Sequence, residues 1–165
     1  MKTLYLIRHA KSDRGNQFIK DIDRPLSERG YKDAYFMSEL MKREGCIPDI
    51  LISSPAVRAY STALIFLKTF GWSEKRLKIN EMLYAETIEI YLAEFKATAN
   101  NFGSVMVFAH NPTIADVSNI FCHDSIQEFP TCAINCLEFE VESWGEISPG
   151  KGKQRFFDFP KNHEK

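Results

Sequence analysis

The chain has 165 residues, a length typical of one domain built around a single hydrophobic core. Leu, Ile, Val and Phe make up more than a quarter of it, above the proportion of about one fifth below which chains tend to be disordered. Its 21 Lys and Arg nearly balance its 22 Asp and Glu, so no overall positive field draws it to nucleic acid or to an anionic membrane, and any anion site must be local.

Apolar runs are short throughout the sequence. The N-terminal run stops at Arg8, before it reaches the length of a signal-peptide core, and the runs at residues 63–67 and 105–109 are far below the ~20 residues of a membrane span. We therefore expect a soluble cytoplasmic protein, with one domain at residues 1–160 and a frayed tail at residues 161–165. No C-x-x-C pair occurs, and we interpret all four cysteines as reduced thiols: Cys46, Cys122, Cys132 and Cys136.

The first half of the chain alternates predicted strands and helices. The β-prone apolar run Thr3–Ile7 predicts a buried strand. A helix is predicted to begin at an N-cap, Ser27, and to end at Gly45. Ile50–Ile52 predicts the second strand, and the apolar spacing over residues 57–67 predicts a second helix directly after it.

The second half continues the pattern and then changes it. A helix is predicted over Thr87–Ala99, a strand over Val105–Phe108 and a helix over residues 114–121. Two late strands are predicted at about residues 134–141 and 154–159, and at least one of them is expected to run antiparallel at an edge. This order predicts an α/β fold, a three-layer α/β/α arrangement with a mostly parallel central sheet and helices on both faces.

Polar side chains follow three of the predicted strands at the point where each strand ends. Arg8 and His9 follow the first strand, and His110 directly follows the strand at residues 105–108. Arg58 lies one turn into the helix that follows the second strand. Because ligands of open α/β sheets bind beyond the carboxyl ends of the strands, we expect these two arginines and two imidazoles to converge.

The same junctions predict an anion-binding crevice. Ser54 and Asn111 each precede a proline and are predicted to cap the next helix, so that two helix N-termini add partial positive charge. An arginine fork matches two phosphoryl oxygens, and each charge-assisted hydrogen bond contributes about 1.5–3 kcal/mol. The sequence has no G-x-x-x-x-G-K-[ST], no G-x-G-x-x-G and no acidic cluster at metal-ligand spacing, so we expect neither a nucleotide nor a metal.

The histidine beside the first arginine gives this crevice a chemistry beyond binding. A neutral imidazole is a competent nucleophile at phosphorus, and neighbouring arginines lower the pKa of His9 and keep the ring neutral near pH 7. His110 is placed to donate a hydrogen bond to phosphoryl oxygens while charge moves between the attacking and the leaving atoms. His9 is therefore the predicted nucleophile.

At these residues the sequence resembles the histidine phosphatase superfamily, also called phosphoglycerate-mutase-like, and within it the SixA-type phosphohistidine phosphatases. The resemblance extends from residue 4 to about residue 120, and four blocks in the family order are much more specific than an isolated Arg-His pair. These blocks are Leu6-Ile7-Arg8-His9-Ala10-Lys11-Ser12, Asp23-Arg24-Pro25-Leu26-Ser27-Glu28-Arg29-Gly30, Ser53-Ser54-Pro55-Ala56-Val57-Arg58-Ala59 and Phe108-Ala109-His110-Asn111-Pro112.

The resemblance implies a phosphoglycerate mutase-like fold and a phosphatase that works without metal or organic cofactor. It implies that His9 accepts the phosphoryl group. Ala10 stands where the superfamily commonly has Gly, as it does in many SixA-like members. The phosphate pocket implied by the resemblance consists of Arg8, Arg24, Arg58 and His110.

The proton donor is the point at which this chain departs from many relatives. They use a glutamate after the second helix or an aspartate directly after the second histidine. Position 111 is Asn, which excludes the second arrangement, so Glu81 is the candidate acid and Glu86 the weaker alternative. Since phosphohistidine expels an imidazole, a better leaving group than the alkoxide of an ester, a poor acid favours phosphohistidine on a protein as the substrate.

Two other functions fit the same residues. A small-molecule phosphomonoesterase or mutase of this superfamily would act on phosphorylated metabolites and depend on Glu81. A non-catalytic module would use the arginines to bind a phosphorylated protein and would form no phosphoenzyme. Arg24 also has a simpler interpretation, an ion pair with Asp21 or Asp23 on a solvated loop. The sequence predicts no nucleic-acid or membrane partner and carries no signal for an oligomeric state.

Overall fold

The computed structural model describes residues 1–85, 87–123 and 125–164. One mixed sheet contains the strands β1 (Lys2–Arg8), β2 (Ile50–Ser53), β3 (Leu77–Ile79), β4 (Ser104–Ala109), β5 (Ile134–Phe139) and β6 (Lys153–Asp158). The α-helices among the described residues are α1 (Glu28–Arg43), α2 (Val57–Thr69), α3 (Ile88–Lys96) and α4 (Thr113–Phe121). The predicted α/β class and the long elements are confirmed, with shifts of a few residues at their ends.

The strands lie in the order β3-β2-β4-β1-β5-β6. β1, β2, β3 and β4 are mutually parallel, whereas β5 pairs antiparallel with β1 and β6 pairs antiparallel with β5. The expected antiparallel late strand is therefore β5, but it lies one position inside the edge that β6 forms. β3 was not predicted, because three residues are too few to show an alternating pattern.

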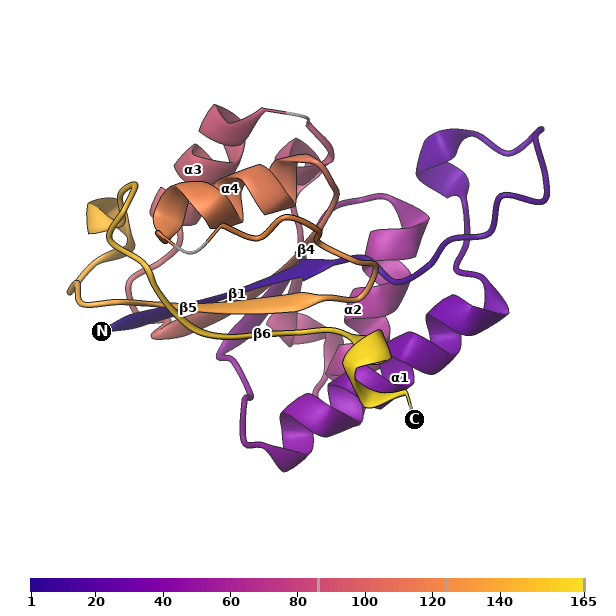
Figure 1. Ribbon diagram of the computed structural model, residues 1–165, viewed down its shortest axis with the longest axis horizontal. Coiled ribbons are helices and arrows are strands. Elements are labelled where there is room, and N and C mark those ends of the chain that lie inside the picture. Colours follow the sequence, from indigo (N-terminus) through magenta and orange to yellow (C-terminus); the bar gives the residue numbers. More distant parts are fainter. Residues whose placement is uncertain (86, 124, 165) are drawn as a thin grey trace.

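Helices cover both faces of the sheet, as predicted (Figure 1). Alternate residues of β1 supply both cores: Leu4 and Leu6 belong to the core shared with α3 and α4, and Tyr5 and Ile7 to the core shared with α1 and α2. All four side chains are buried, as in a central parallel strand that is covered on two sides. The buried strand β1 therefore fixes the position of Arg8, its last residue, at the carboxyl-end edge of the sheet, where the side chains become polar.

The start of α1 fixes the chain that leaves β1. Ser27 is the N-cap, as predicted, and its Oγ accepts from the backbone N–H of Gly30 at 3.1 Å. The Ser27 N–H donates to the carbonyl of Lys11 at 2.9 Å. A Cβ on Gly30 would lie 2.1 Å from that same carbonyl oxygen, so only glycine allows the first turn of α1 to support the segment that follows His9.

The two other predicted caps are wrong. The N-caps of α2 and α4 are Ala56 and Pro112, and neither makes a side-chain capping bond. Oγ of Ser54 accepts from the backbone N–H of Ala56 at 3.2 Å, before the helix begins, and also contacts His110. Nδ2 of Asn111 donates to the carbonyl of Phe129 at 2.9 Å. Both side chains therefore contact the edge of the sheet, and Oδ1 of Asn111 has no hydrogen-bond partner in the described residues.

The last described residues lie against the start of α1; the domain bounds and the frayed tail at residues 161–165 remain predictions. Residues Pro160–His163 form a 3-10 helix in which the ring of His163 lies 5.3 Å from that of Phe36 on α1. Glu164 forms an ion pair with Arg29 at the start of α1. Lys165 lies outside the described residues. In the part of the chain that is described, no helix is long and apolar enough to cross a membrane.

Candidate active site

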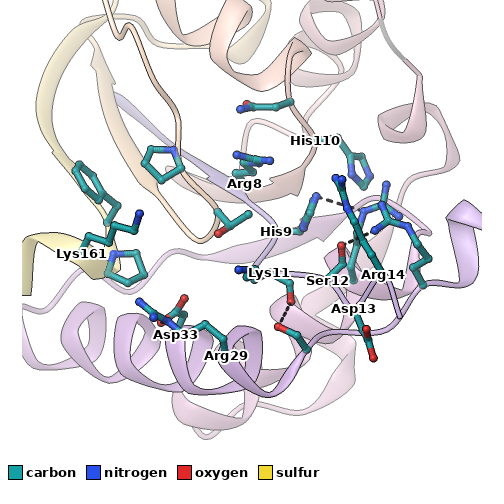
Figure 2. Close-up of a pocket in the computed structure, with 18 of the residues that line it drawn as sticks. Arg8, His9, Lys11, Ser12, Asp13, Arg14, Arg29, Asp33, His110 and Lys161 are labelled. Atoms are coloured by element: carbon teal, nitrogen blue, oxygen red, sulfur yellow. Dashed lines mark hydrogen bonds and ion pairs between the residues drawn. The ribbon is translucent and has the colours of Figure 1, made fainter. Parts of the chain in front are cut away.

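The polar edge of the sheet forms a cleft of about 720 Å³. Its wall includes the predicted nucleophile His9 and the four residues predicted for the phosphate pocket: Arg8, Arg24, Arg58 and His110. Figure 2 shows His9 and His110 close together, with Lys161 and Asp33 toward the other side of the cleft. Three chain segments far apart in sequence therefore meet here because β1, β2 and β4 end at one edge.

Glu81 is placed differently from those five residues. It is exposed at the start of a 3-10 helix, Glu81–Tyr84, and is not among the residues that line the cleft. Glu86 lies outside the described residues. The role predicted for Glu81 as proton donor remains a prediction.

The ring of His9 is held in one tautomer by its two hydrogen bonds. Nδ1 lies 2.7 Å from the carbonyl oxygen of Ala10, which can only accept, so Nδ1 carries the proton. Nε2 accepts from Nε of Arg58 at 3.3 Å. Only 8% of His9 is exposed. The imidazole therefore presents an unprotonated Nε2 whose lone pair faces an arginine.

Burial and nearby positive charge keep both histidines neutral. Burial is the largest cause that lowers the pKa of His9 to about 3; the hydrogen bond to Ala10 opposes it, and His110, Arg58 and Arg8 add to the lowering. Burial, followed by the charge of Arg58, lowers the pKa of His110 to about 4. The two ring centroids are 5.2 Å apart. The neutral state expected for His9 is supported, but burial rather than the arginines is the larger cause.

His110 and Arg8 present polar atoms without partners in the described residues. Nε2 of His110 lies 2.7 Å from Oγ of Ser54, whereas its buried Nδ1 has no hydrogen-bond partner. Arg8 donates from Nη1 to the carbonyl of Phe129 at 2.9 Å, and its Nε is also buried without a partner. Because unpaired buried polar groups are unfavourable, these atoms mark places where a polar ligand would be stabilised.

Arg24 combines the two interpretations given to it. It forms the predicted ion pair with Asp21 at 2.9 Å, yet its side chain is only 17% exposed, it lines the cleft, and its Nη1 donates to Oγ of Ser12 at 2.7 Å. Sequence analysis missed the contacts of Ser12, Ser54 and Tyr84, and it considered Asp21 only as a partner of Arg24. These residues lie in loops and short helices, whose paths no periodic pattern predicts.

Basic side chains outnumber acidic ones around the cleft. The acidic residues of the wall are Asp13, Asp33 and Glu128; the basic residues are Arg8, Lys11, Arg14, Arg24, Arg29, Arg58 and Lys161. This excess lies on a chain whose formal net charge is −1. The positive field is therefore local and suits a multiply charged anion.

The neutral histidines predict a loss of stability in mild acid. Their folded-state pKa values lie below the ordinary value of 6.5, so the unfolded chain binds more protons and stability falls as pH falls from about 6.5 toward 4. Thermal unfolding followed by circular dichroism between pH 7 and pH 4.5 should show a decreasing melting temperature. His9→Gln and His110→Gln should each flatten that dependence, whereas His123→Gln, at an exposed position, should keep it. An equally steep dependence in the doubly substituted protein would contradict this explanation.

Comparison with known proteins identifies the family to which this geometry belongs. A phosphoglycerate mutase from Clavibacter michiganensis is 37% identical over 89 residues, which cover 50% of this chain and 36% of that mutase. The chain thus spans only about a third of the length of that relative. An uncharacterized chloroplastic protein of Arabidopsis thaliana is 24% identical over 155 residues, covering 88% of this chain and 70% of that protein.

Solved structures share the whole fold. The protein histidine phosphatase SixA complexed with tungstate superposes with a TM-score of 0.83 at 19% identity and covers 98% of this chain and 99% of its own. A mycobacterial glucosyl-3-phosphoglycerate phosphatase complexed with VO3 gives a TM-score of 0.74 at 16% identity, with coverage of 97% and 100%. The sequence pattern of the histidine phosphatase superfamily (branch 1) matches residues 4–87, which is half of the chain, and the chain belongs to that superfamily.

Proposed function

We propose that this protein is a phosphatase that carries the phosphoryl group on Nε2 of His9 and that its substrate is phosphohistidine on another protein. The observation that carries the proposal is the fixed tautomer of His9, whose unprotonated Nε2 faces Arg58 in a cleft with an excess of positive charge. Guanidinium groups, rather than a metal ion, would neutralise the phosphoryl oxygens.

The reaction has two displacement steps. In the first, the lone pair of Nε2 attacks phosphorus, and the bond from phosphorus to the substrate imidazole breaks with its electron pair moving to that imidazole nitrogen. In the second, a water oxygen attacks the phosphorus held by His9, and inorganic phosphate leaves as Nε2 regains its lone pair. Nδ1 of His110, which has no partner among the described residues, would donate to a phosphoryl oxygen in both steps if it carries the proton.

The leaving group favours phosphohistidine over phosphate esters. An alkoxide needs a proton in the transition state, whereas imidazole is a much better leaving group. Among the described residues, no carboxyl group has a hydrogen bond to His9 or His110 that would place an acid beside the phosphoryl site. The similarity in fold to a SixA structure that holds tungstate, a tetrahedral oxyanion, supports the same assignment.

A second candidate function is hydrolysis or transfer of the phosphoryl group of a small phosphate ester. The 37% identity to a phosphoglycerate mutase favours it, although that match covers 50% of this chain. This candidate needs an effective acid, so it predicts strong ester hydrolysis that is lost in Glu81→Gln. A non-catalytic phospho-binding module would bind phosphate analogues but would form no covalent adduct.

Trapping the phosphoenzyme tests the proposal. The protein is mixed with a radiolabelled phosphohistidine protein, and in parallel with labelled sugar phosphates, and portions are quenched in acid and in base. The expected product is a labelled protein that is stable in base and labile in acid, formed faster from phosphohistidine than from the esters. Labelling from esters alone would favour the second candidate, and binding without any adduct would favour the non-catalytic module.

A further inference from the structure

The carboxylate of Asp21 joins three side chains beside the cleft. Its Oδ1 accepts from Nε and Nη2 of Arg24 at 3.1 and 2.9 Å. Its Oδ2 accepts from Nη2 of Arg58 at 3.1 Å and from the hydroxyl of Tyr84 at 2.6 Å. The backbone carbonyl of Asp21 accepts from Nη1 of Arg58 at 2.7 Å. One residue therefore holds both terminal nitrogens of Arg58.

These contacts set the direction of the remaining nitrogen of Arg58. A guanidinium group is planar, so fixing its two terminal nitrogens also fixes the line along which Nε donates. That nitrogen donates to Nε2 of His9 at 3.3 Å. The side chain of Arg58 is only 7% exposed, whereas that of Asp21 is 55% exposed. Asp21 thus contacts the far end of Arg58, on the side away from His9.

We propose that Asp21 is a positioning residue: it holds the far end of Arg58 and so directs Nε of Arg58 toward Nε2 of His9. Nε of Arg58 is then also directed toward the phosphoryl group that Nε2 of His9 accepts. The last part of this inference rests on the proposed function. Asp21 is not among the residues that line the cleft, so it acts through Arg58 rather than on the substrate.

Tyr84 extends the network to the second histidine. Its hydroxyl donates to Asp21, and its ring meets the ring of His110 edge to face, with centroids 5.6 Å apart. The bond from Tyr84, followed by those from Arg24 and Arg58, holds the pKa of Asp21 far below its usual range against the opposing effect of burial. Asp21 is therefore an ionised acceptor at any working pH and does not supply the proton for the leaving group.

The opposite role for Asp21 would be competition with phosphate for the arginines. Competition requires the carboxylate to occupy the nitrogen that faces the nucleophile. In the structure the carboxylate accepts from Nη2 and the backbone carbonyl of Asp21 accepts from Nη1, which leaves Nε directed at His9. The geometry therefore favours positioning, and the two roles predict opposite changes in rate.

Single-turnover labelling of His9 in Asp21→Ala and Asp21→Asn tests the inference. We expect the rate of phosphoenzyme formation to fall about tenfold or more in Asp21→Ala, because a misdirected donor loses much of its effect, and to fall less in Asp21→Asn, which keeps one side-chain acceptor. The affinity for inorganic phosphate should change much less than the rate. Asp23→Ala is the matched control, since Asp23 lies in the same short helix, is exposed and does not contact Arg58 through its side chain.

A second readout does not depend on turnover. The ¹⁵N resonance of Nε2 of His9 reports the hydrogen bond from Arg58, and it should shift in Asp21→Ala but not in Asp23→Ala. An unchanged labelling rate with an unchanged resonance would overturn the inference, as would faster labelling with tighter phosphate binding. If the unsubstituted protein forms no phosphoenzyme, the proposed function fails, and the resonance still decides whether Asp21 orients Arg58.

Discussion

Replacing His9 with alanine is expected to abolish turnover, a loss of at least about a thousandfold, because the group proposed to bond to phosphorus is then absent. The cleft would keep its arginines, and with them its affinity for phosphate. His9→Ala should therefore still bind inorganic phosphate while forming no acid-labile adduct. Steady-state release of phosphate from a phosphohistidine protein, together with base-quenched labelling, measures both quantities on the same preparation.

Two observations keep this prediction separate from a loss of folding. His9 is buried, so His9→Ala is first compared with the unsubstituted protein by thermal unfolding. His123→Ala is the matched histidine control, because this exposed residue does not line the cleft, and it should retain full activity. A folded His9→Ala protein with normal turnover would contradict the proposed mechanism.

The long elements of the fold could be predicted because each carries a repeated pattern. β1 is apolar on both faces, and Ala34, Met37 and Met41 recur at helical spacing on α1. The position of β5 inside the sheet edge could not be predicted in this way, since strand order depends on pairing between distant segments. β3 was missed for a different reason, because its three residues are held in place by pairing with β2 rather than by a pattern of their own.

The core of the site could be predicted because it follows from sheet geometry. Arg8, His9 and His110 end parallel neighbouring strands, so their convergence requires only that β1 and β4 pair in register. The family resemblance added Arg24, which no strand end supplies. Neither the sheet geometry nor the family resemblance predicts the contacts of Asp21 and Tyr84. These contacts depend on how the loop after β1 and the 3-10 helix after β3 fold toward α2.

The N-cap predictions for Ser54 and Asn111 failed because local sequence preference does not show which contacts form at the edge of the sheet. Ser54 and Asn111 have side chains that favour helix N-termini, but Ser54 contacts His110 and Asn111 donates to the carbonyl of Phe129 at the edge of the sheet. A polar residue between a strand and a helix can therefore either cap the helix or belong to a site at the strand end, and its sequence position alone does not distinguish the two. In this chain Ser54 connects the start of α2 to the end of β4 through its contact with His110 and through its N–H, which donates to the carbonyl of Phe108 at 3.0 Å.

Arg58→Ala is expected to lower the rate of phosphoenzyme formation by about a hundredfold or more, the effect of losing one transition-state donor. Arg58 donates from Nε to Nε2 of His9, the proposed nucleophile, so the same N–H would lie beside a phosphoryl group bound to that nitrogen. Arg58→Lys should restore little of the rate, because an ammonium group keeps the charge but cannot contact Asp21 and His9 with the same planar fork. Rapid-quench labelling at saturating and at limiting substrate concentrations separates the effect on phosphoryl transfer to His9 from the effect on substrate binding.

The control for Arg58 must share its chemistry but not its position. Arg43, exposed at the end of α1 and paired, among the described residues, only with Glu44, meets this requirement, and Arg43→Ala should label at the normal rate. Because Arg58 is buried, its variants are assayed well below their melting temperatures. Normal labelling by folded Arg58→Ala would mean that Arg58 only supports the fold. In that case Arg8 and His110 would have to stabilise the transition state, through the Nε and Nδ1 atoms that have no hydrogen-bond partner in the described part of the chain.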